Sequence, residues 1–360
     1  MNRNTAVRQT LLDMTDGTTV RDDGLRLIVV GASAGGVAAL TSLVRDLPGD
    51  LAAAVLVVLH VGAESILPDL LDRAGPLPAR RAERGQSIEP GRVYVAPPGS
   101  HLLVHDRHLL LRRGPRENLA RPAIDPMFRS AACSFGSRVI GVVLTGSLND
   151  GTAGLRAIKR CGGLAVVQDP AEAPFRDMPA SALAHVDVDH CLGVGAMAGL
   201  LAQLVLEPPG PEVPIPGDIR LEAAIAAEEH VDMSSENELG VPAPFTCPEC
   251  QGPLWEIADA RMLRYRCHTG HAFTAEVMLD AQAEETERIL WALLRSHQQR
   301  AELARRLAEK ERAGRPGLAE RFRDRAKEYD SDAETVKRLL LQGDGAPREE
   351  RPEADERLAP

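Results

Sequence analysis

Between residues 26 and 206 the chain alternates short, uninterrupted apolar runs with segments of helical periodicity. Strands that are apolar at every position are buried on both faces, as in parallel sheets covered by helices. The expected strands lie at 27–30, 53–59, 93–96, 102–105, 109–112, 139–144 and 165–168. The expected helices lie at 37–47, 66–74, 126–135, 151–161, 179–184 and 196–206. The alternation predicts an α/β domain with a doubly wound, mostly parallel sheet in three Rossmann-like layers.

Changes in composition along the 360 residues divide the chain into six segments. We expect a disordered tail at 1–24, the α/β domain at 25–207, a Pro- and Glu-rich linker at 208–243, a Cys/His segment at 244–275, a helical segment at 276–341 and a disordered tail at 342–360. No apolar run reaches the roughly 18 residues of a membrane span, and the first 24 residues lack the apolar core of a secretory signal. We therefore expect no membrane insertion and a cytoplasmic location. The net charge of −10 argues against nucleic acid as a partner.

The first expected strand runs into Gly31-Ala32-Ser33-Ala34-Gly35-Gly36, where a helix begins. In one interpretation this is the phosphate loop of a dinucleotide-dependent oxidoreductase, with Ser33 at the second glycine of G-x-G-x-x-G. Serine weakens that interpretation, because the second glycine lets the backbone approach the pyrophosphate. In the other interpretation Ser33 is a nucleophile on a tight strand-to-helix turn, whose backbone N–H groups are available to an oxyanion.

Two further polar residues follow buried strands, His60 after 53–59 and Asp150 after 139–144. Taken singly, a histidine after a strand is more often structural than catalytic, and an aspartate before a helix is more often an N-cap. Ligands of open α/β sheets, however, bind beyond the carboxyl ends of the strands, where all three residues lie. A serine, a base and an orienting carboxylate that converge there fit nucleophilic acyl transfer.

Five ordered motifs carry a family resemblance over about residues 25–207. They are the Ser33 loop, the strand ending in His60, Arg121-Pro122-Ala123-Ile124-Asp125, Leu144-Thr145-Gly146 with Asn149-Asp150-Gly151, and Phe175 with Met178-Pro179. With them the domain resembles the catalytic domain of the CheB-type protein-glutamate methylesterases of chemotaxis receptors. The resemblance implies a serine hydrolase without a catalytic cofactor, which cleaves glutamate γ-methyl esters and in many members deamidates glutamine. It also implies Ser33 as nucleophile, His60 as base, Asp150 as its orienting group, and a methylated receptor or other protein as substrate.

The backbone N–H groups of Ala34 and Ser147 are the expected oxyanion donors. The chain departs from the family pattern here, since the family usually has threonine at Ala34 and Met-Gly where Ser147-Leu148 stand. Many members also carry an N-terminal receiver domain, which we do not expect in the 24 residues before the first strand. These departures leave open a non-catalytic signalling adaptor that retains the fold. Arg121 and Asp125 are either a structural ion pair or part of the substrate rim.

Cys247 and Cys250 are followed after sixteen residues by Cys267, and then by His268 and His271. Two ligand pairs separated by a short β excursion have the spacing of a zinc ribbon. We expect one structural zinc held by the three cysteines and His271, with His268 as the rival fourth ligand. The other cysteines lie singly in apolar surroundings and are expected to be buried: Cys133, Cys161 and Cys191.

The segment 276–341 carries one apolar stripe at helical spacing over 318–340 and a weaker one over 290–304, with a Gly/Pro break at 314–317. This pattern predicts an αα-hairpin. Two hypotheses stay open for it. Either the two stripes bury each other, or the hairpin is an element for docking or self-association that takes the place of the receiver domain.

Overall fold

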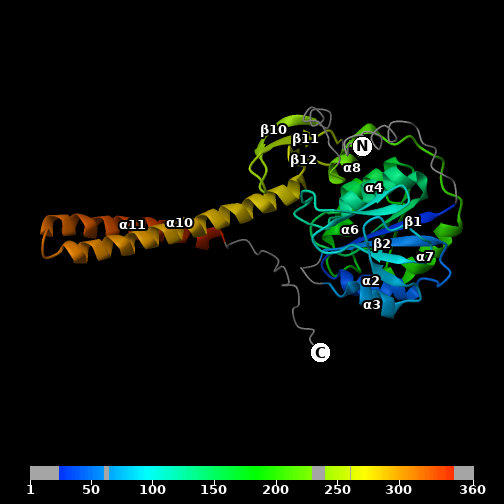
Figure 1. Ribbon diagram of the computed structural model, residues 1–360, viewed down its shortest axis with the longest axis horizontal. Helices are drawn as coiled ribbons and strands as arrows, with labels where there is room; N and C mark the ends of the chain where they lie inside the picture. The colour runs from blue at the N-terminus through cyan, green and yellow to red at the C-terminus, as the bar shows by residue number, and fades with distance from the viewer. Residues whose placement is uncertain (1–23, 61–64, 229–239, 260, 344–360) are drawn as a thin grey trace, which may run out of the picture. The chain divides into compact units, whose positions relative to one another are not determined.

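The computed structural model describes residues 24–60, 65–228, 240–259 and 261–343, so the expected tails fall almost entirely outside it (Figure 1). The described residues divide into two compact units, one up to Val277 and one from Met278 onward. Within these ranges, no helix is both long enough and apolar enough to span a bilayer.

The first unit is built on a seven-stranded sheet of order β3-β4-β2-β1-β7-β8-β9, in which all neighbouring strands are parallel. The strands are β1 (Arg26–Ala32), β2 (Ala53–Leu59), β3 (Ala79–Arg81), β4 (Val93–Val95), β7 (Val139–Val143), β8 (Leu164–Gln168) and β9 (His190–Leu192). Every residue of the two central strands β1 and β2 is buried, as their apolar sequences predict.

Alternate side chains of β1 enter two separate cores, because successive residues of a strand point to opposite faces. Leu27 and Val29 pack with α4 (Ile124–Phe135), α5 (Thr152–Arg160) and α6 (Asp177–His185). Ile28 and Val30 pack with α2 (Gly36–Asp46), α3 (Leu67–Ala74) and α7 (Val194–Leu206). Helices thus cover both faces of the sheet (Figure 1), and the predicted doubly wound, three-layer fold is confirmed.

Most differences from the sequence prediction are small and local. The predicted strand 53–59 coincides with β2, whereas the helix predicted at 126–135 already begins at Ile124. Strands β3 and β9 were not predicted, because each has three residues and shows no periodicity. Cys161 is buried and Cys133 half-buried, but the prediction was wrong for Cys191, which is exposed. Cys191 lies on β9, an edge strand with a neighbour on one side only.

Three elements flank this sheet. Strands β5 (His101–His105) and β6 (His108–Arg112) form an antiparallel hairpin before α4. Helix α8 (Gly217–Ala226) lies in the expected linker, and its Ile219 joins the core that contains α4. A four-stranded antiparallel ribbon follows, made of β10 (Gly240–Thr246), β11 (Pro253–Ile257), β12 (Arg264–Cys267) and β13 (Ala272–Thr274). Strand β10 begins at Gly240, before the expected start of the Cys/His segment at residue 244.

The second unit is formed by α10 (Ala275–Glu311), whose first residues belong to the first unit, and α11 (Pro316–Gly343). Leu294, Ala333, Val336 and Leu340 bury one another between the two helices. The predicted stripes therefore do pack together in the hairpin. Other apolar side chains of α10 stay exposed, among them Trp291 at 47% and Leu303 at 58%.

Candidate active site and metal centre

Ser33 stands on the turn between β1 and α2, which is tight for reasons visible in the sequence. Gly35 has φ +73°, a left-handed conformation that glycine adopts without strain, and it caps α2. The backbone N–H of Ser33 donates to the carbonyl of Thr145 at 3.0 Å, so the turn is tied to the loop after β7. A side chain at Gly146 would clash with Ser33 and Met178. The two loops can therefore approach only because that position lacks a Cβ.

His60 follows β2 and connects Ser33 to Asp150. Its Nδ1 is 3.1 Å from the Ser33 Oγ, and its Nε2 is 2.8 Å from Asp150 Oδ2. With the proton on Nε2, the ring donates to the aspartate and accepts from the serine hydroxyl. The histidine side chain is 23% exposed and the aspartate 3%, so the set opens toward solvent at its serine end. The structure thus brings together the three residues predicted from separate strand ends.

Asp150 is enclosed by hydrogen-bond donors. Its Oδ2 also accepts from the backbone N–H of Ile124 at 2.7 Å, and its Oδ1 accepts from the Asn118 amide at 3.1 Å and from the Gly151 N–H at 3.0 Å. Burial alone would raise the pKa of Asp150, but the hydrogen bond and charge of His60, with these further donors, hold that pKa below its usual range. The carboxylate stays ionised and fixed in orientation.

A second carboxyl group, Asp125, lies beside Asp150. It accepts hydrogen bonds from Asn118 at 2.9 Å and from the backbone N–H groups of Gly151 at 3.0 Å and Gly154 at 2.6 Å. Burial and then the negative charge of Asp150 raise the pKa of Asp125. Arg121 instead donates to the carbonyls of residues 113 and 114. The Arg121–Asp125 ion pair weighed from the sequence is thus absent from the described part of the chain.

The loop after β7 explains two more of the sequence motifs. The Thr145 hydroxyl lies 3.1 Å from the carbonyls of Ala34 and Phe175 and accepts the Phe175 N–H at 2.9 Å. The expected oxyanion donors, Ala34 and Ser147, therefore sit on loops held together by Thr145. Leu148 has φ +62°, in the left-handed region. The unusual residue identified there from the sequence thus coincides with a backbone conformation that favours glycine.

Sequence reasoning missed Asn118 and the use of Asn149. Asn118 is buried and has φ +49°, which asparagine tolerates better than most residues. A lone asparagine in a polar loop carries no signal of this role. Asn149 was noted only as part of a motif. Asn118 contacts both carboxyl groups and the ribbon, and Asn149, which directly precedes Asp150, contacts the ribbon, as described below.

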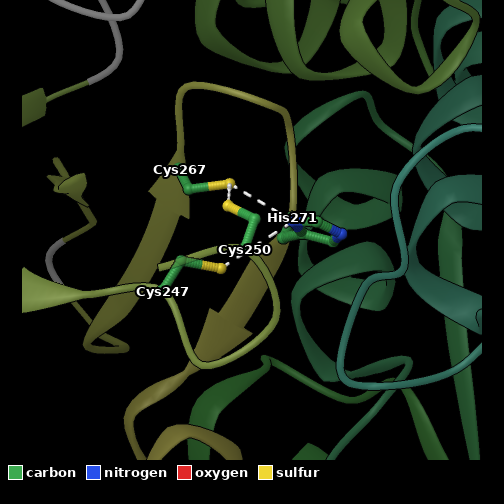
Figure 2. Close-up of side chains that lie close together, drawn as sticks. All are labelled: Cys247, Cys250, Cys267 and His271. Atoms are coloured by element: carbon green, nitrogen blue, oxygen red, sulfur yellow. Dashed lines mark hydrogen bonds between the residues drawn. The ribbon is translucent and has the colours of Figure 1, made fainter. Parts of the chain in front are cut away.

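Three cysteines and one histidine converge at one end of the ribbon (Figure 2). The ligand atoms of Cys247, Cys250, Cys267 and His271 all lie within 4.8 Å of one another. The Sγ atoms of Cys250 and Cys267 are 3.7 Å apart, and His271 Nδ1 lies 3.4 Å from Cys267 Sγ and 3.8 Å from Cys247 Sγ. Ligands about 2.3 Å from a tetrahedral zinc are themselves separated by about 3.7 Å, so the set fits zinc.

The fourth position and its surroundings also suit a metal site. His271, not its rival His268, faces the three sulfur atoms, and His268 is exposed. The other ring nitrogen of His271, Nε2, lies 3.8 Å from Glu249 Oε2. A carboxylate behind a ligating histidine is a common means of fixing the ring. Glu249 in turn pairs with Arg116 at 3.1 Å.

The fold is thus that of a doubly wound α/β protein, with a hydrogen-bonded serine, histidine and aspartate at the ends of its strands. Residues 28–201 match the family model described as CheB methylesterase. A Leptospira interrogans protein named "Putative protein-glutamate methylesterase/protein-glutamine glutaminase" is 39% identical over 180 residues, which cover 49% of this chain and 93% of the relative. The chain belongs to the CheB methylesterase family, and the resemblance found in the sequence is confirmed.

Two further matches also cover about half of the chain. Protein-glutamate methylesterase/protein-glutamine glutaminase 2 of Anaeromyxobacter dehalogenans is 36% identical over 196 residues, which are 54% of this chain and 58% of that protein. The crystal structure of the Thermotoga maritima CheB methylesterase catalytic domain is 31% identical, covers 50% of this chain and 98% of its own, and has a TM-score of 0.48. Family membership favours neither the oxidoreductase nor the adaptor hypothesis.

Proposed function

We propose that this protein is a protein-glutamate methylesterase that acts on chemotaxis-type receptors, with Ser33 as its nucleophile. The observation that carries the proposal is the continuous hydrogen-bonded series from Ser33 through His60 to Asp150. A serine hydroxyl is a weak nucleophile until a neighbouring base takes its proton. His60 Nδ1 is within reach of that proton, and Asp150 holds the ring in the tautomer that can accept it.

The reaction proceeds in two steps. Ser33 Oγ attacks the γ-carbonyl carbon of the methyl ester while His60 Nδ1 takes the hydroxyl proton, and the carbonyl oxygen becomes an oxyanion. Backbone N–H groups of Ala34 and Ser147 are the proposed donors to this oxyanion. His60 then returns the proton to the departing methoxide, so methanol leaves and an acyl-serine remains. Water attacks the acyl-serine by the same route and releases the glutamate carboxylate. With glutamine as substrate, the leaving group is ammonia.

The Cys/His cluster takes no part in this chemistry. We propose that it binds one zinc ion through Cys247, Cys250, Cys267 and His271. Four protein ligands complete a tetrahedral shell and leave no position for water or substrate, which is the arrangement of structural zinc sites. Such a site supplies folding free energy to a small domain.

Labelling by a fluorophosphonate, together with methanol release from a peptide carrying glutamate γ-methyl ester, tests the proposed nucleophile. We expect the wild-type chain to label and to release methanol, and Ser33→Ala to lose both by at least about 10³-fold, because the residual rate then depends on binding alone. Ser42→Ala is the matched control, since Ser42 lies on α2 and contacts only Arg45 among the hydrogen bonds described. Full activity of Ser33→Ala would refute the assignment, and an inert wild-type chain would favour the adaptor.

A further inference from the structure

Strand β13 of the ribbon is paired with the loop that precedes α4. Ala272 and Glu117 form a parallel β-bridge. The backbone N–H of Asn118 donates to the carbonyl of Ala272 at 2.8 Å, and the N–H of Ala272 donates to the carbonyl of Arg116 at 3.4 Å. Ala272 directly follows His271, a member of the Cys/His cluster. The loop therefore extends the ribbon sheet next to the metal centre.

The side chain of Asn118 continues this connection to the active site. Its Oδ1 accepts the backbone N–H of Thr274 at 3.2 Å. Its amide nitrogen donates to Asp150 Oδ1 at 3.1 Å and to Asp125 Oδ2 at 2.9 Å. One buried side chain thus contacts both the ribbon backbone and the carboxylate that orients His60. Its amide can serve both only in one orientation, because oxygen accepts and nitrogen donates.

Asn149, which immediately precedes Asp150, makes a second connection. Its Oδ1 accepts the hydroxyl hydrogen of Thr274 at 2.8 Å, and its amide nitrogen donates to Glu276 at the start of α10. Thr274 therefore holds Asn118 with its backbone and Asn149 with its side chain. Both connections start from the last residue of β13 and end at Asp150 or beside it.

Buried charges tie β12 to the same loop. Arg266, next to Cys267, donates to Glu117 at 3.2 Å and to Glu222 at 2.9 Å. Arg264 pairs with Glu222 at 2.5 Å, and Arg129 of α4 pairs with Glu117 at 2.6 Å. All five side chains are at most 9% exposed. Because removing one partner of a buried ion pair leaves an uncompensated charge, separating the ribbon from the loop costs free energy.

We infer that the ribbon is a metal-dependent positioning element of the active site, which holds Asp150 in place through Asn118 and Asn149. The inference rests on the proposed esterase function. The ribbon spans only about 35 residues, from 240 to 274, and a segment of this size usually needs a metal or disulfides to fold, so metal binding supplies part of its folding free energy. Loss of the metal loosens β13, releases the two asparagines and leaves Asp150 with fewer fixed donors. Asn118 is a positioning residue and contacts no substrate.

Replacing Asn118 tests the connection inside the active site. Residues that orient a catalytic or metal-ligating group change rates by about 10–100-fold when removed. We expect Asn118→Ala to lower kcat for methyl-ester hydrolysis by that factor and to leave KM within about twofold, because the effect lies on the triad and not on substrate binding. We expect Asn118→Asp, which keeps the shape but replaces the donor by an acceptor, to be at least as impaired. Wild-type kcat in both variants would overturn the inference.

Removing the metal tests the connection from its other end, with His268→Ala as the matched control for His271→Ala. We expect His271→Ala, or the wild-type chain treated with a chelator, to lose bound zinc and at least tenfold in kcat. Zinc added alone to the chelated wild type should restore the rate. His268→Ala should retain zinc and activity, because His268 is exposed and lies outside the cluster.

Amide hydrogen exchange provides a readout that does not depend on turnover. On loss of metal we expect faster exchange in the segment 116–120 and in the loop 145–151, while β1 and β2 stay protected. Unchanged exchange in both loops would overturn the inference even if activity fell. The proposed function fails separately: it is refuted if Ser33→Ala retains activity, whereas unaltered Asn118→Ala and His271→Ala enzymes with an inactive Ser33→Ala would refute the positioning role alone.

Discussion

Asp150 and Asp125 are two buried carboxyl groups that share two donors, the Asn118 amide and the backbone N–H of Gly151. Two negative charges held side by side in a water-excluded site repel each other, so the pKa values of the two carboxyl groups move in opposite directions. The pKa of Asp150 falls below its usual range because His60 and backbone N–H groups offset its burial, and the pKa of Asp125 rises because burial and the charge of Asp150 act together. The residue that orients the histidine is therefore the one that stays ionised.

Leu148 combines a bulky side chain with a left-handed backbone, φ +62°. For a residue with a Cβ this conformation destabilises the folded chain by about 1–2 kcal/mol. Glycine avoids that strain but loses more conformational entropy on folding, which costs about 0.5–1 kcal/mol. We expect Leu148→Gly to raise the free energy of unfolding slightly, by about 0.5 kcal/mol, as measured by urea denaturation. A loss of more than about 1 kcal/mol would show that the contacts of the half-buried Leu148 outweigh its strain.

At the scale of elements, α8 links α4 to the ribbon through Glu222, which pairs with Arg129 of α4 and with Arg264 and Arg266 of β12. Burial would raise the pKa of Glu222, but Arg264, Arg129 and Arg266 lower it far below its usual range. A carboxyl group whose folded-state pKa is lowered stabilises the protein above its unfolded pKa, and this contribution is lost as the pH falls toward the folded value. At neutral pH Glu222 therefore stabilises the contacts that α8 makes with α4 and β12.

We expect Glu222→Gln to lower the free energy of unfolding by about 3–5 kcal/mol at pH 7. Among the described residues, the substitution leaves the buried Arg264 with Asp259 at 4.0 Å as its nearest carboxylate, and Arg129 and Arg266 with Glu117 alone. The difference from wild type should shrink as the pH falls below about 4.5, where Glu222 takes up a proton in the unfolded chain. Denaturation at a series of pH values measures this. Asp218→Asn on the same helix is the control: Asp218 pairs with Arg160 at a partly exposed site and should cost under about 1 kcal/mol. A pH-independent difference would contradict the assignment.

At the scale of the whole molecule, the two units have separate apolar clusters. The sheet has one core on each face, and the helical hairpin has its own around Leu294. We expect Leu294→Ala to destabilise the hairpin by about 2–3 kcal/mol, since it leaves a cavity, and to leave methyl-ester hydrolysis unchanged. Leu303→Ala, on the same helix but 58% exposed, should have little effect.

Thermal unfolding followed by circular dichroism, with the rate of methanol release as the second readout, checks this expectation. A fall in activity with Leu294→Ala would show that the hairpin contributes to the reaction. The role of the hairpin in docking or self-association stays a prediction, since the packed stripes and the exposed Trp291 are compatible with either hypothesis.

Local patterns were enough to predict the architecture and to bring the proposed catalytic residues Ser33, His60 and Asp150 to one edge of the sheet. Runs such as 53–59 are apolar at every position, and only a strand buried on both faces accommodates them. Once the strands are placed, Ser33, His60 and Asp150 must share one edge, because parallel strands end on the same side. The spacing of Cys247, Cys250, Cys267 and His271 likewise needs only a local ribbon to bring them together.

Contacts between distant segments could be known only from the folded chain. Arg266 meets Glu117 across 149 positions, and Thr274 meets Asn118 across 156. Neither residue of such a pair carries a local signal, since a buried arginine or asparagine looks like a surface residue until its partner is in place. The sequence thus specified which residues perform the proposed chemistry. Tertiary packing decided that the ribbon lies against the loop that holds Asp150, because that contact depends on burying charges from three separate segments together.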